Sequence, residues 1–267
     1  MTDRYAVIGN PVAHSKSPWI HAEFARQTRQ DLDYGRIEAP RDGFAAAVDA
    51  FRAAGARGAN VTLPFKEAAF RYCGGSVSAR SLAAQAVNTL VFEGAAVRGD
   101  NTDGVGLLRD LSANLGRAIA GQRVLVMGAG GAAQGVLAPL IEAQPRRLVV
   151  ANRTVDKARL LARRYGASAG GGYDDIRAES FDLLINATSA GLAGEAPPLA
   201  ASAFAPGALG YDMVYGRDTP FLALARAAGA AAHDGSGMLV EQAAESFLLW
   251  RGLRPDTAPV LAALRRA

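Results

Sequence analysis

A glycine-rich stretch in the middle of the chain is the feature that most constrains its fold. Residues 123–133 read Arg-Val-Leu-Val-Met-Gly-Ala-Gly-Gly-Ala-Ala, an apolar run that ends at glycines and continues into an alanine-rich segment. This pattern predicts a strand, a tight turn and a helix. Gly128 permits the turn, Gly130 lets a bound group approach the backbone, and Ala133 fills the third small position of a G-x-G-x-x-[G/A] motif. Free amides at the start of such a helix suit a pyrophosphate, so the stretch predicts a dinucleotide site.

A second apolar run, residues 147–151, follows and ends in Asn152-Arg153-Thr154. In an NAD site the end of this strand usually carries an acid that binds the ribose 2′-hydroxyl, whereas an arginine accommodates a 2′-phosphate. Here the position holds Asn152 and Arg153, with Lys157 one turn further on, and a guanidinium binds phosphate through two hydrogen bonds. We therefore expect NADP rather than NAD. The alternative is a solvated helix start whose charges aid solubility only.

The composition bounds the class of protein. With 267 residues, 50% apolar and 20% charged, the chain is expected to form a globular protein of two domains. Its net charge of +4 comes from arginine, because lysine occurs only at Lys16, Lys66 and Lys157. No basic run marks a nucleic-acid surface, so no nucleic-acid partner is expected. The single cysteine, Cys73, excludes an internal disulfide, and we expect no metal site.

The start of the sequence leads directly into strand-like residues 5–8, without a signal-peptide core, and no transmembrane span is found further on. We expect a cytoplasmic protein without a membrane partner. The sequence leaves both a monomer and a homodimer open.

Strands and helices alternate along the chain, which predicts an α/β protein with mostly parallel sheets. The expected strands of the first part are 5–8, 34–38, 58–62 and 86–92, with helices at 18–27, 44–54 and 104–115. Strands at 123–127, 147–151, 181–186 and 208–213 predict a doubly wound, Rossmann-type domain. Within it, Gly170-Gly171-Gly172 is expected to be a loop. A long helix at 237–250 and a short final helix complete the chain.

Three groups of polar residues in the first part follow predicted strands, at the ends where open α/β sheets bind ligands. In the first group, Ser15 and Ser17 flank Lys16 just before a proline. Ser17 is expected to cap the helix, which leaves the hydroxyl of Ser15 for a ligand. The alternative is that both hydroxyls serve only caps and turns.

The other two groups combine amide, hydroxyl and charged side chains: Asn60, Thr62 and Lys66, and then Asn88 with Asn101–Gly104. A lysine is usually a solvated surface charge. Because this chain otherwise prefers arginine, however, Lys66 is interpreted as a position that needs a compact, titratable ammonium. Asp103 alone would be read as a helix N-cap. Together, Lys66 and Asp103 would make an acid–base pair.

As an ordered set, these motifs resemble the shikimate dehydrogenase family, and the resemblance runs nearly end to end. The stretches similar to the family's substrate domain are Gly9-Asn10-Pro11, His14–Pro18, Asn60–Lys66, Val87–Leu90, Asp100–Gly104 and Gly237–Ala243. Those similar to its cofactor domain are Gly128–Ala133, Asn152-Arg153-Thr154, Asn186–Ser189 and Met213-Val214-Tyr215. Several are short, but their order makes the set specific.

The resemblance implies a reversible, NADPH-dependent reduction of 3-dehydroshikimate to shikimate, in the route through chorismate to aromatic amino acids. It implies that Lys66 and Asp103 are the catalytic pair. The residues expected to bind substrate are Ser15, Ser17, Asn60, Thr62, Lys66, Asn88, Asp103, Tyr215 and Gln242. Those expected to bind NADP are Gly128, Ala129, Gly130, Gly131, Ala132, Asn152, Arg153, Thr154 and Lys157, with Thr188, Ser189, Met213, Gly235 and Met238 on the nicotinamide side.

The resemblance also implies a discontinuous first domain, because the helix that carries Gln242 packs back onto it in this family. We expect a substrate-binding domain over residues 1–102, completed by C-terminal helices within 238–267. A Rossmann-type NADP-binding domain is expected over residues 103–237.

Three positions depart from the family's usual pattern: Ala22 after His21, Gln85 before the Val87 motif, and Ser236. None is a proposed catalytic group, but they leave open a relaxed substrate choice toward quinate. The nearest alternative is therefore a quinate/shikimate dehydrogenase paralogue. Because its NAD-using forms tend to carry an acid in place of the Asn-Arg-Thr motif, Arg153 and Thr154 argue against NAD.

Two further alternatives share parts of the pattern. A two-domain dehydrogenase of amino-acid or folate type would have the glycine motif but would not explain the serines, Lys66 and Asp103 together. A non-catalytic ligand-sensing protein could keep the fold without turnover. The presence of both Lys66 and Asp103 argues against such a sensor.

Overall fold

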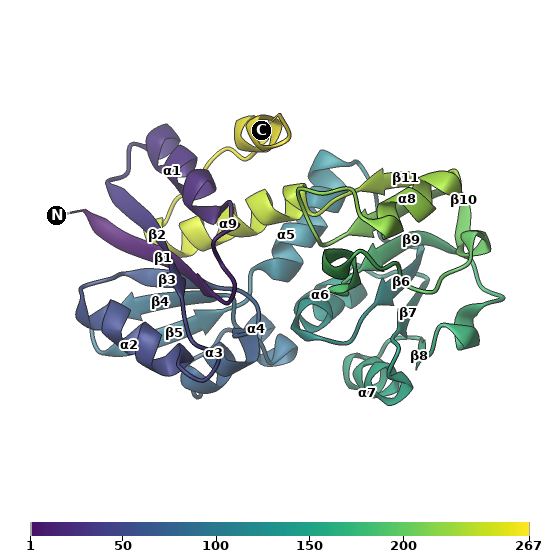
Figure 1. The fold of residues 1–267 in the computed structure, drawn as a ribbon, viewed down its shortest axis with the longest axis horizontal. Helices are drawn as coiled ribbons and strands as arrows, with labels where there is room; N and C mark the ends of the chain where they lie inside the picture. The colour runs from purple at the N-terminus through teal and green to yellow at the C-terminus, as the bar shows by residue number, and fades with distance from the viewer. Residues whose placement is uncertain (1, 267) are drawn as a thin grey trace. The chain divides into compact units, whose positions relative to one another are not determined.

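The structure, a computed structural model, describes residues 2–266 and divides into two compact units (Figure 1). The first unit comprises the residues up to Gly106 together with those from Val240 onward, and the second comprises Leu107–Leu239. Each unit contains one sheet with helices, so the predicted α/β class is confirmed. The first unit thus combines residues from both ends of the sequence.

The sheet of the first unit has the strand order β2-β1-β3-β4-β5. Its strands are β1 (Asp3–Gly9), β2 (Leu32–Glu38), β3 (Gly58–Val61), β4 (Thr89–Glu93) and β5 (Ala96–Asp100). Its helices are α1 (Ser17–Thr28), α2 (Phe44–Ala53), α3 (Lys66–Tyr72), α4 (Ala79–Ala84) and α10 (Ala258–Leu264), with parts of α5 (Asp103–Arg109) and α9 (Ser236–Arg251). Only β4 opposes its neighbours, so the sheet is mostly parallel, as predicted.

Strand β1 is buried on both faces, which explains its unbroken apolar run. Ala6 and Ile8 belong to one hydrophobic cluster, whereas Tyr5 and Val7 belong to another. Alternate side chains of a strand point to opposite faces, so covering both faces requires apolar residues at successive positions. The carboxyl ends of β1 and β3 lie together in register, and the polar residues that follow β3 therefore start at one edge of the sheet.

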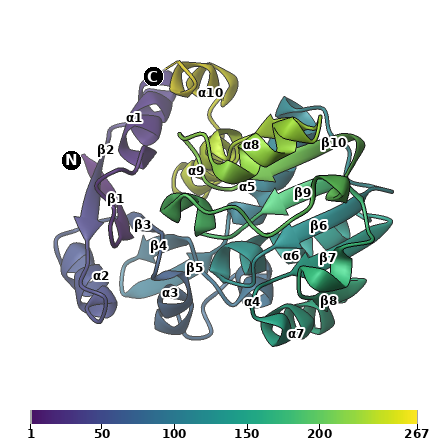
Figure 2. The same cartoon turned by 45° about the vertical axis from the view of Figure 1, so that its right-hand side comes forward.

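The second unit has a six-stranded parallel sheet in the order β11-β10-β9-β6-β7-β8 (Figure 2). Its strands are β6 (Arg123–Met127), β7 (Arg147–Ala151), β8 (Ala169–Gly171), β9 (Phe181–Asn186), β10 (Phe204–Asp212) and β11 (Ala231–His233). Its helices are α6 (Gly131–Glu142), α7 (Val155–Tyr165) and α8 (Pro220–Ala227), and short 3₁₀ turns lie at Asp174–Ile176, Ala190–Ala193 and Ala201–Ala203. Read from β8, this is the strand order of a dinucleotide-binding Rossmann fold.

Helices cover both faces of this second sheet. Val124 and Val126 pack in one cluster with α6 and α7, whereas Leu125 and Met127 pack in another with α8. The expected helix at 104–115 is found as α5, followed by a π-helical turn over Asp110–Asn114. The Rossmann-type fold predicted from the sequence is confirmed.

Two local predictions are wrong. Gly170 and Gly171 are not in a loop but in β8, which pairs with β7. A side chain at Gly170 would collide with the backbone of Ala158, so the glycine marks a close approach of α7 to the strand. Nor does Ser17 cap α1: the N-cap position is Lys16 without a side-chain cap, and Ser15 Oγ accepts a 3.3 Å hydrogen bond from Ser17 N.

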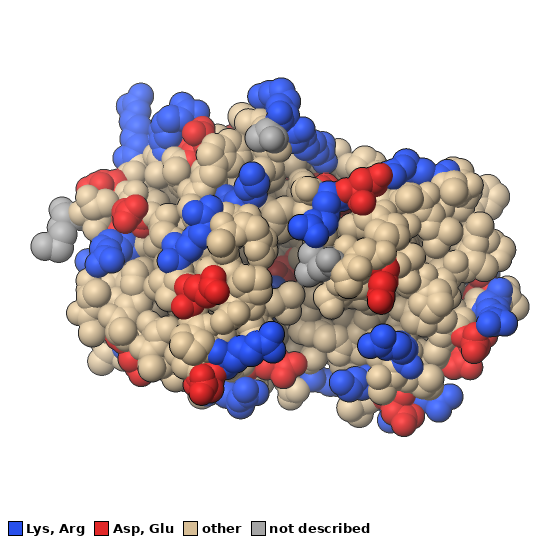
Figure 3. Space-filling model, in the orientation of Figure 1, with Lys and Arg blue, Asp and Glu red and all other residues tan. Residues whose placement is uncertain are grey.

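On the face drawn in Figure 3, positive and negative side chains are interspersed, so the small excess of positive charge is spread over this face. Among the described residues, no helix combines the length and the apolar character needed to cross a membrane.

His21 is a buried titratable group in the core of the first unit. Its ring stacks on Tyr34, with 4.3 Å between the ring centroids, and Phe24, Phe247 and Trp250 surround it. Neither ring nitrogen makes a hydrogen bond within the described part of the chain. Burial lowers the pKa of His21 to about 3, against a smaller opposing effect of the Asn60 side chain.

We expect His21 to make stability pH-dependent. Because the unfolded chain protonates this residue near the ordinary histidine pKa of about 6.5, its contribution is complete above that pH and falls as the pH decreases toward 3. Between pH 6.5 and 5 the loss is about 2 kcal/mol. Urea denaturation of the wild type and His21→Leu at both pH values measures it. Equal losses in both proteins would show that His21 is not the group responsible.

Candidate active site

A salt bridge between Lys66 and Asp103 lies at the carboxyl edge of the first sheet. Lys66 is the first residue of α3, and Asp103 is the first residue of α5. Lys66 Nζ lies 2.6 Å from Asp103 Oδ2, and the two side chains are 16% and 6% exposed. The structure therefore brings together the two residues that the sequence predicted as an acid–base pair.

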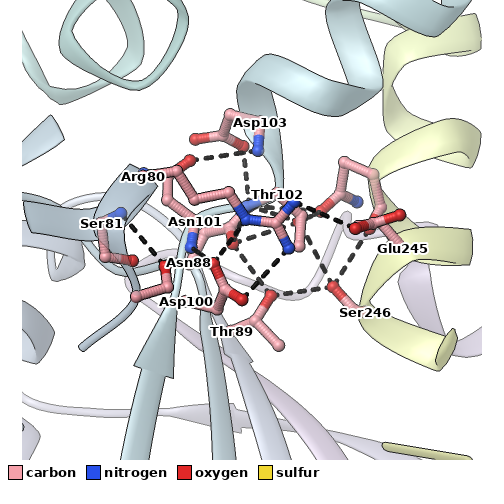
Figure 4. Close-up of polar contacts among 12 residues, drawn as sticks. Arg80, Ser81, Asn88, Thr89, Asp100, Asn101, Thr102, Asp103, Glu245 and Ser246 are labelled. Atoms are coloured by element: carbon pink, nitrogen blue, oxygen red, sulfur yellow. Dashed lines mark hydrogen bonds and ion pairs between the residues drawn. The ribbon is translucent and has the colours of Figure 1, made fainter. Parts of the chain in front are cut away.

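Asn88 connects this salt bridge to the neighbouring strand (Figure 4). Its Nδ2 donates to Asp103 Oδ1 at 2.8 Å and to Thr102 Oγ1 at 3.0 Å. Its Oδ1 accepts from the backbone N of Thr102 at 2.9 Å. Both carboxylate oxygens of Asp103 thus have a donor, and the carboxylate is held on two sides.

Asn60 forms a second buried node, beside Asn88. Its Oδ1 accepts from Tyr34 Oη at 2.7 Å, and its Nδ2 donates to Ser246 Oγ at 3.0 Å and to Thr89 Oγ1 at 3.2 Å. Burial raises the pKa of Tyr34 well above its ordinary value, which keeps the phenol a neutral donor. Asn60 is therefore fixed by β2, β4 and α9 at once.

The remaining predicted substrate residues lie in four places. Gln242 joins the network from α9, because its Oε1 lies 3.4 Å from Asn88 Nδ2 and 3.3 Å from Thr102 Oγ1. Ser15 and Ser17 form their own pair at the start of α1, with 3.2 Å between the hydroxyl oxygens. Thr62, half-buried, follows β3 directly. Tyr215 belongs to the second unit, in the segment after β10.

Three members of the network were not among the predicted site residues: Tyr34, Thr89 and Ser246. Thr102 belongs to the third polar group that the sequence indicated. Ser246 follows Gln242 by one helical turn, and residues four apart share a helix face. That spacing could have identified it. No comparable local signal marks Tyr34, which reaches Asn60 from another strand.

The glycine motif of the second unit has the geometry needed for a close ligand. Gly128 has a φ of 111°, a conformation that side chains strongly disfavour, and a Cβ there would lie 2.9 Å from the carbonyl oxygen of Ala187. Gly130 is the N-cap of α6 and supplies no side-chain cap. The first amides of α6 thus have no side-chain cap, and Ala129, Gly131 and Ala132 lie on either side of the cap position. Uncapped amides at a helix start are the arrangement that suits a phosphate.

The basic residues predicted for a 2′-phosphate lie at the end of the next strand, β7. Asn152 is half-buried and its Nδ2 donates to the backbone O of Thr154 at 3.0 Å. Arg153, Thr154 and Lys157 are exposed around the start of α7. The neighbouring strand ends thus carry a glycine turn and a cationic group, which fits a phosphorylated dinucleotide.

Asp212 ties together the segments that follow β9 and β10. Its Oδ1 accepts from Val214 N at 3.0 Å, and its Oδ2 accepts from Thr219 Oγ1 at 2.6 Å and Asn186 Nδ2 at 3.1 Å. Asn186 Oδ1 in turn accepts from Thr188 Oγ1 at 2.7 Å. Burial raises the pKa of Asp212 despite these hydrogen bonds. The predicted nicotinamide residues Thr188, Ser189 and Met213 all lie in the segments that it connects.

The other two predicted nicotinamide residues, Gly235 and Met238, lie at the start of α9. The Met238 backbone N donates to Tyr211 Oη at 3.3 Å, and Tyr211 Oη donates to Asp110 Oδ2 at 2.6 Å. A side chain at Gly237 would collide with the Asp110 carboxylate. The π-helical turn therefore holds the beginning of α9 through one carboxylate.

Among the described residues, no group of three or more His, Cys, Asp or Glu side chains could hold a metal ion. The first unit carries the hydrogen-bonding and charged side chains around Lys66 and Asp103, and the second unit carries a dinucleotide-type turn.

Three family models match the chain. They describe a shikimate dehydrogenase substrate-binding domain over residues 7–90, a shikimate/quinate 5-dehydrogenase over 110–193 and a shikimate 5′-dehydrogenase C-terminal domain over 235–265. Together they span most of the sequence, in the order that the motifs predicted.

Similar proteins match over nearly the whole length. The shikimate dehydrogenase (NADP⁺) of Aromatoleum aromaticum is 58% identical, over 99% of this chain and 97% of its own. That of Methylobacillus flagellatus is 56% identical, over 99% and 100%. The shikimate 5-dehydrogenase of Thermus thermophilus, solved with NADP(H) and shikimate, is 37% identical with a TM-score of 0.89, over 99% of each chain.

Replacing Asp212 by alanine should weaken the cofactor unit. Three donors, two of them buried, lose their acceptor, so the free energy of unfolding is expected to fall by about 2–4 kcal/mol. The dissociation constant for NADPH is expected to rise, because the segments with Thr188 and Met213 lose their common anchor. Urea denaturation and NADPH fluorescence titration measure the two effects.

Asp182→Ala is a matched control. It removes a carboxylate near the start of β9, where Asp182 pairs with Arg123 at 2.8 Å. Asn186, which binds Asp212, lies at the other end of the same strand. This variant is expected to bind NADPH as the wild type does. Equal NADPH affinity in Asp212→Ala and the wild type would refute the role of Asp212.

Proposed function

Because the chain belongs to the shikimate dehydrogenase family, we infer that it catalyses the reversible, NADPH-dependent reduction of 3-dehydroshikimate to shikimate. The observation that carries this proposal is the 2.6 Å salt bridge of Lys66 and Asp103, set within a network of amides and hydroxyls. The second unit supplies the dinucleotide fold. The reaction places the protein in the biosynthesis of chorismate and the aromatic amino acids.

The chemistry assigns a role to each member of the pair. NADPH, when bound, supplies the hydride that reduces the ketone. As that hydride arrives, negative charge develops on the ketone oxygen, and the Lys66 ammonium stabilises this oxygen and donates a proton to it. Asp103 orients the ammonium through the 2.6 Å contact. In the oxidation of shikimate the same groups act in reverse, with Lys66 as the base.

The amides and hydroxyls of the first unit suit a ring that carries hydroxyls and a carboxylate. We assign Asn60, Asn88 and Gln242 to the ring hydroxyls near the catalytic pair, with Thr62 beside them. The hydroxyls of Ser15 and Ser17 and the phenol of Tyr215 are assigned to the remaining polar groups of the substrate. These assignments are part of the proposal and are supported by the shared network of Asn88 and Gln242.

NADP would be held by the second unit. Gly128 and Gly130 let the pyrophosphate approach the backbone at the start of α6, and Arg153 with Lys157 would bind the 2′-phosphate. The substrate domain is proposed as residues 1–102 with 238–267, and the NADP domain as 103–237. The cytoplasmic location and the choice between monomer and homodimer stay predictions.

A relaxed choice of substrate is the second candidate function. It is favoured by one of the matching family models, which describes both shikimate and quinate 5-dehydrogenases. Absorbance at the nicotinamide band, with shikimate or quinate and NADP⁺ or NAD⁺ in all four pairings, distinguishes the two. Fast reduction only with shikimate and NADP⁺ supports the main proposal. Comparable rates with quinate support the alternative, and no reduction in any pairing would refute both.

Lys66→Ala should impair turnover more than substrate binding. The contact of the ammonium with the reacting oxygen strengthens in the transition state, so kcat is expected to fall by about 10³-fold while KM for shikimate changes far less. Steady-state kinetics with shikimate and NADP⁺ measure both constants. A kcat near the wild-type value would remove Lys66 from the mechanism.

Arg153→Ala should change the choice of cofactor. Losing a charge-assisted contact to the 2′-phosphate is expected to raise KM for NADPH by about 10- to 100-fold and to leave KM for NADH nearly unchanged. Arg159, an exposed arginine on α7, the helix that follows Arg153, provides the control variant Arg159→Ala. If both variants raise KM for NADPH equally, the effect comes from the loss of positive charge in general and not from recognition of the 2′-phosphate.

A further inference from the structure

One arginine connects three segments of the first unit beside the site. Arg80 on α4 donates through Nε to Asp100 Oδ1 at 2.6 Å and through Nη2 to Asp100 Oδ2 at 3.1 Å. Its Nη1 donates to Glu245 Oε1 on α9 at 3.0 Å (Figure 4). The side chains of Arg80, Asp100 and Glu245 are 28%, 5% and 14% exposed. The guanidinium is thus largely buried between two carboxylates.

Asp100 anchors the segment that leads to Asp103. Its Oδ1 also accepts from the next backbone N, of Asn101, at 2.7 Å, and its own carbonyl accepts from Asn88 N at 3.0 Å. Asn101 Oδ1 then accepts from Asp103 N at 3.1 Å. A continuous chain of hydrogen bonds therefore runs from the Arg80 guanidinium to the backbone of the proposed catalytic aspartate.

Glu245 anchors the part of α9 that faces the substrate residues. It lies between Gln242 and Ser246, both of which contact Thr102. Its second oxygen, Oε2, accepts from Arg254 Nη1 at 2.8 Å, and Arg254 Nη2 pairs with Glu241 at 2.9 Å. This helix segment is thus fixed by two arginines, one of which also holds the Asp103 segment.

We propose that Arg80 is a positioning residue for this reaction, which sets the Asp103 segment and the α9 segment with Gln242 in register with each other. The inference rests on the proposed function. Arg80 donates from three nitrogens of its planar guanidinium: Nε and Nη2 bind Asp100 as a bidentate pair, and Nη1 binds Glu245. A lysine ammonium cannot reproduce this planar arrangement of donors.

The electrostatics of the cluster agree with this role. Burial alone would raise the pKa of Asp100, but hydrogen bonds from Arg80 and Ser78 and the charge of Arg80 outweigh it and lower the pKa. Without the guanidinium, the buried Asp100 carboxylate would lose its cation, and Glu245 would keep only its contact with Arg254. Two like charges from separate segments would then face each other with no cation between them, which is unfavourable. Removing Arg80 should therefore move the two segments apart.

The test is chemical rescue of Arg80→Ala. We expect kcat/KM for shikimate to fall by about 100-fold, because small displacements of catalytic groups cost that much, while the NADPH dissociation constant stays unchanged. Guanidinium chloride at low, non-denaturing concentration should restore much of the activity, and sodium or ammonium chloride should not. Arg80→Lys should stay impaired.

Arg147→Ala is the matched control. Arg147 forms a bidentate pair with Glu179 in the second unit, at 2.8 Å and 2.9 Å, and has no part in the proposed site. We expect this variant to lose stability, to keep its turnover and to gain no activity from guanidinium. Near-wild-type kinetics of Arg80→Ala, or recovery in any salt alike, would overturn the proposal.

If Arg80→Ala does not fold, Glu245→Gln tests the positioning role of Arg80 instead. It leaves the Arg80–Asp100 pair in place and weakens the two contacts that fix this part of α9, those of Glu245 with Arg80 and Arg254. KM for shikimate should therefore rise more than kcat falls. Wild-type values of both would overturn the proposal. Failure of the wild type to oxidise shikimate would instead refute the proposed function, so the two failures are distinguishable.

Discussion

The buried contact between Lys66 and Asp103 is the interaction on which the rest of the site depends. Removing two charges from water costs more than their attraction returns unless the remaining hydrogen-bonding capacity is satisfied. The structure satisfies it for the carboxylate: Lys66 and Asn88 each bind one of its oxygens, and the Asp103 backbone N donates to Asn101. The surrounding amides and hydroxyls therefore hold the Asp103 carboxylate in place beside Lys66.

In the second unit, the arrangement of the predicted cofactor residues depends on glycines at which the backbone lies very close to other groups. At Gly128 a side chain would meet the carbonyl of Ala187, and at Gly237 it would collide with Asp110. Gly128 lies in the loop after β6 and is itself predicted to bind the cofactor, and Gly237 lies at the start of α9 after the loop that follows β11, next to the predicted Met238. Buried carboxylates then fix those loops, Asp212 after β9 and β10 and Asp110 at the start of α9. The second unit thus combines glycines, which let chain segments pack closely, with buried carboxylates, which hold those segments in place.

The sequence predicted elements whose signal is local. Buried parallel strands such as β6, β7 and β9 are continuous apolar runs, and their extents were found closely. Strand β8 was missed because Gly170 serves close packing against α7, which only the folded chain shows. The Arg80 cluster was missed because its contacts join residues 20 and 165 positions apart. No spacing rule predicts such contacts.

Lys66 and Asp103 are expected to act as one unit in catalysis, and a double-mutant cycle tests this coupling most directly. kcat/KM for shikimate is measured for the wild type, Lys66→Ala, Asp103→Ala and the double variant. Groups that act together lose nearly everything at the first removal, so the double variant should be about as slow as the slower single variant. Losses that simply multiply would show two independent groups and contradict the account.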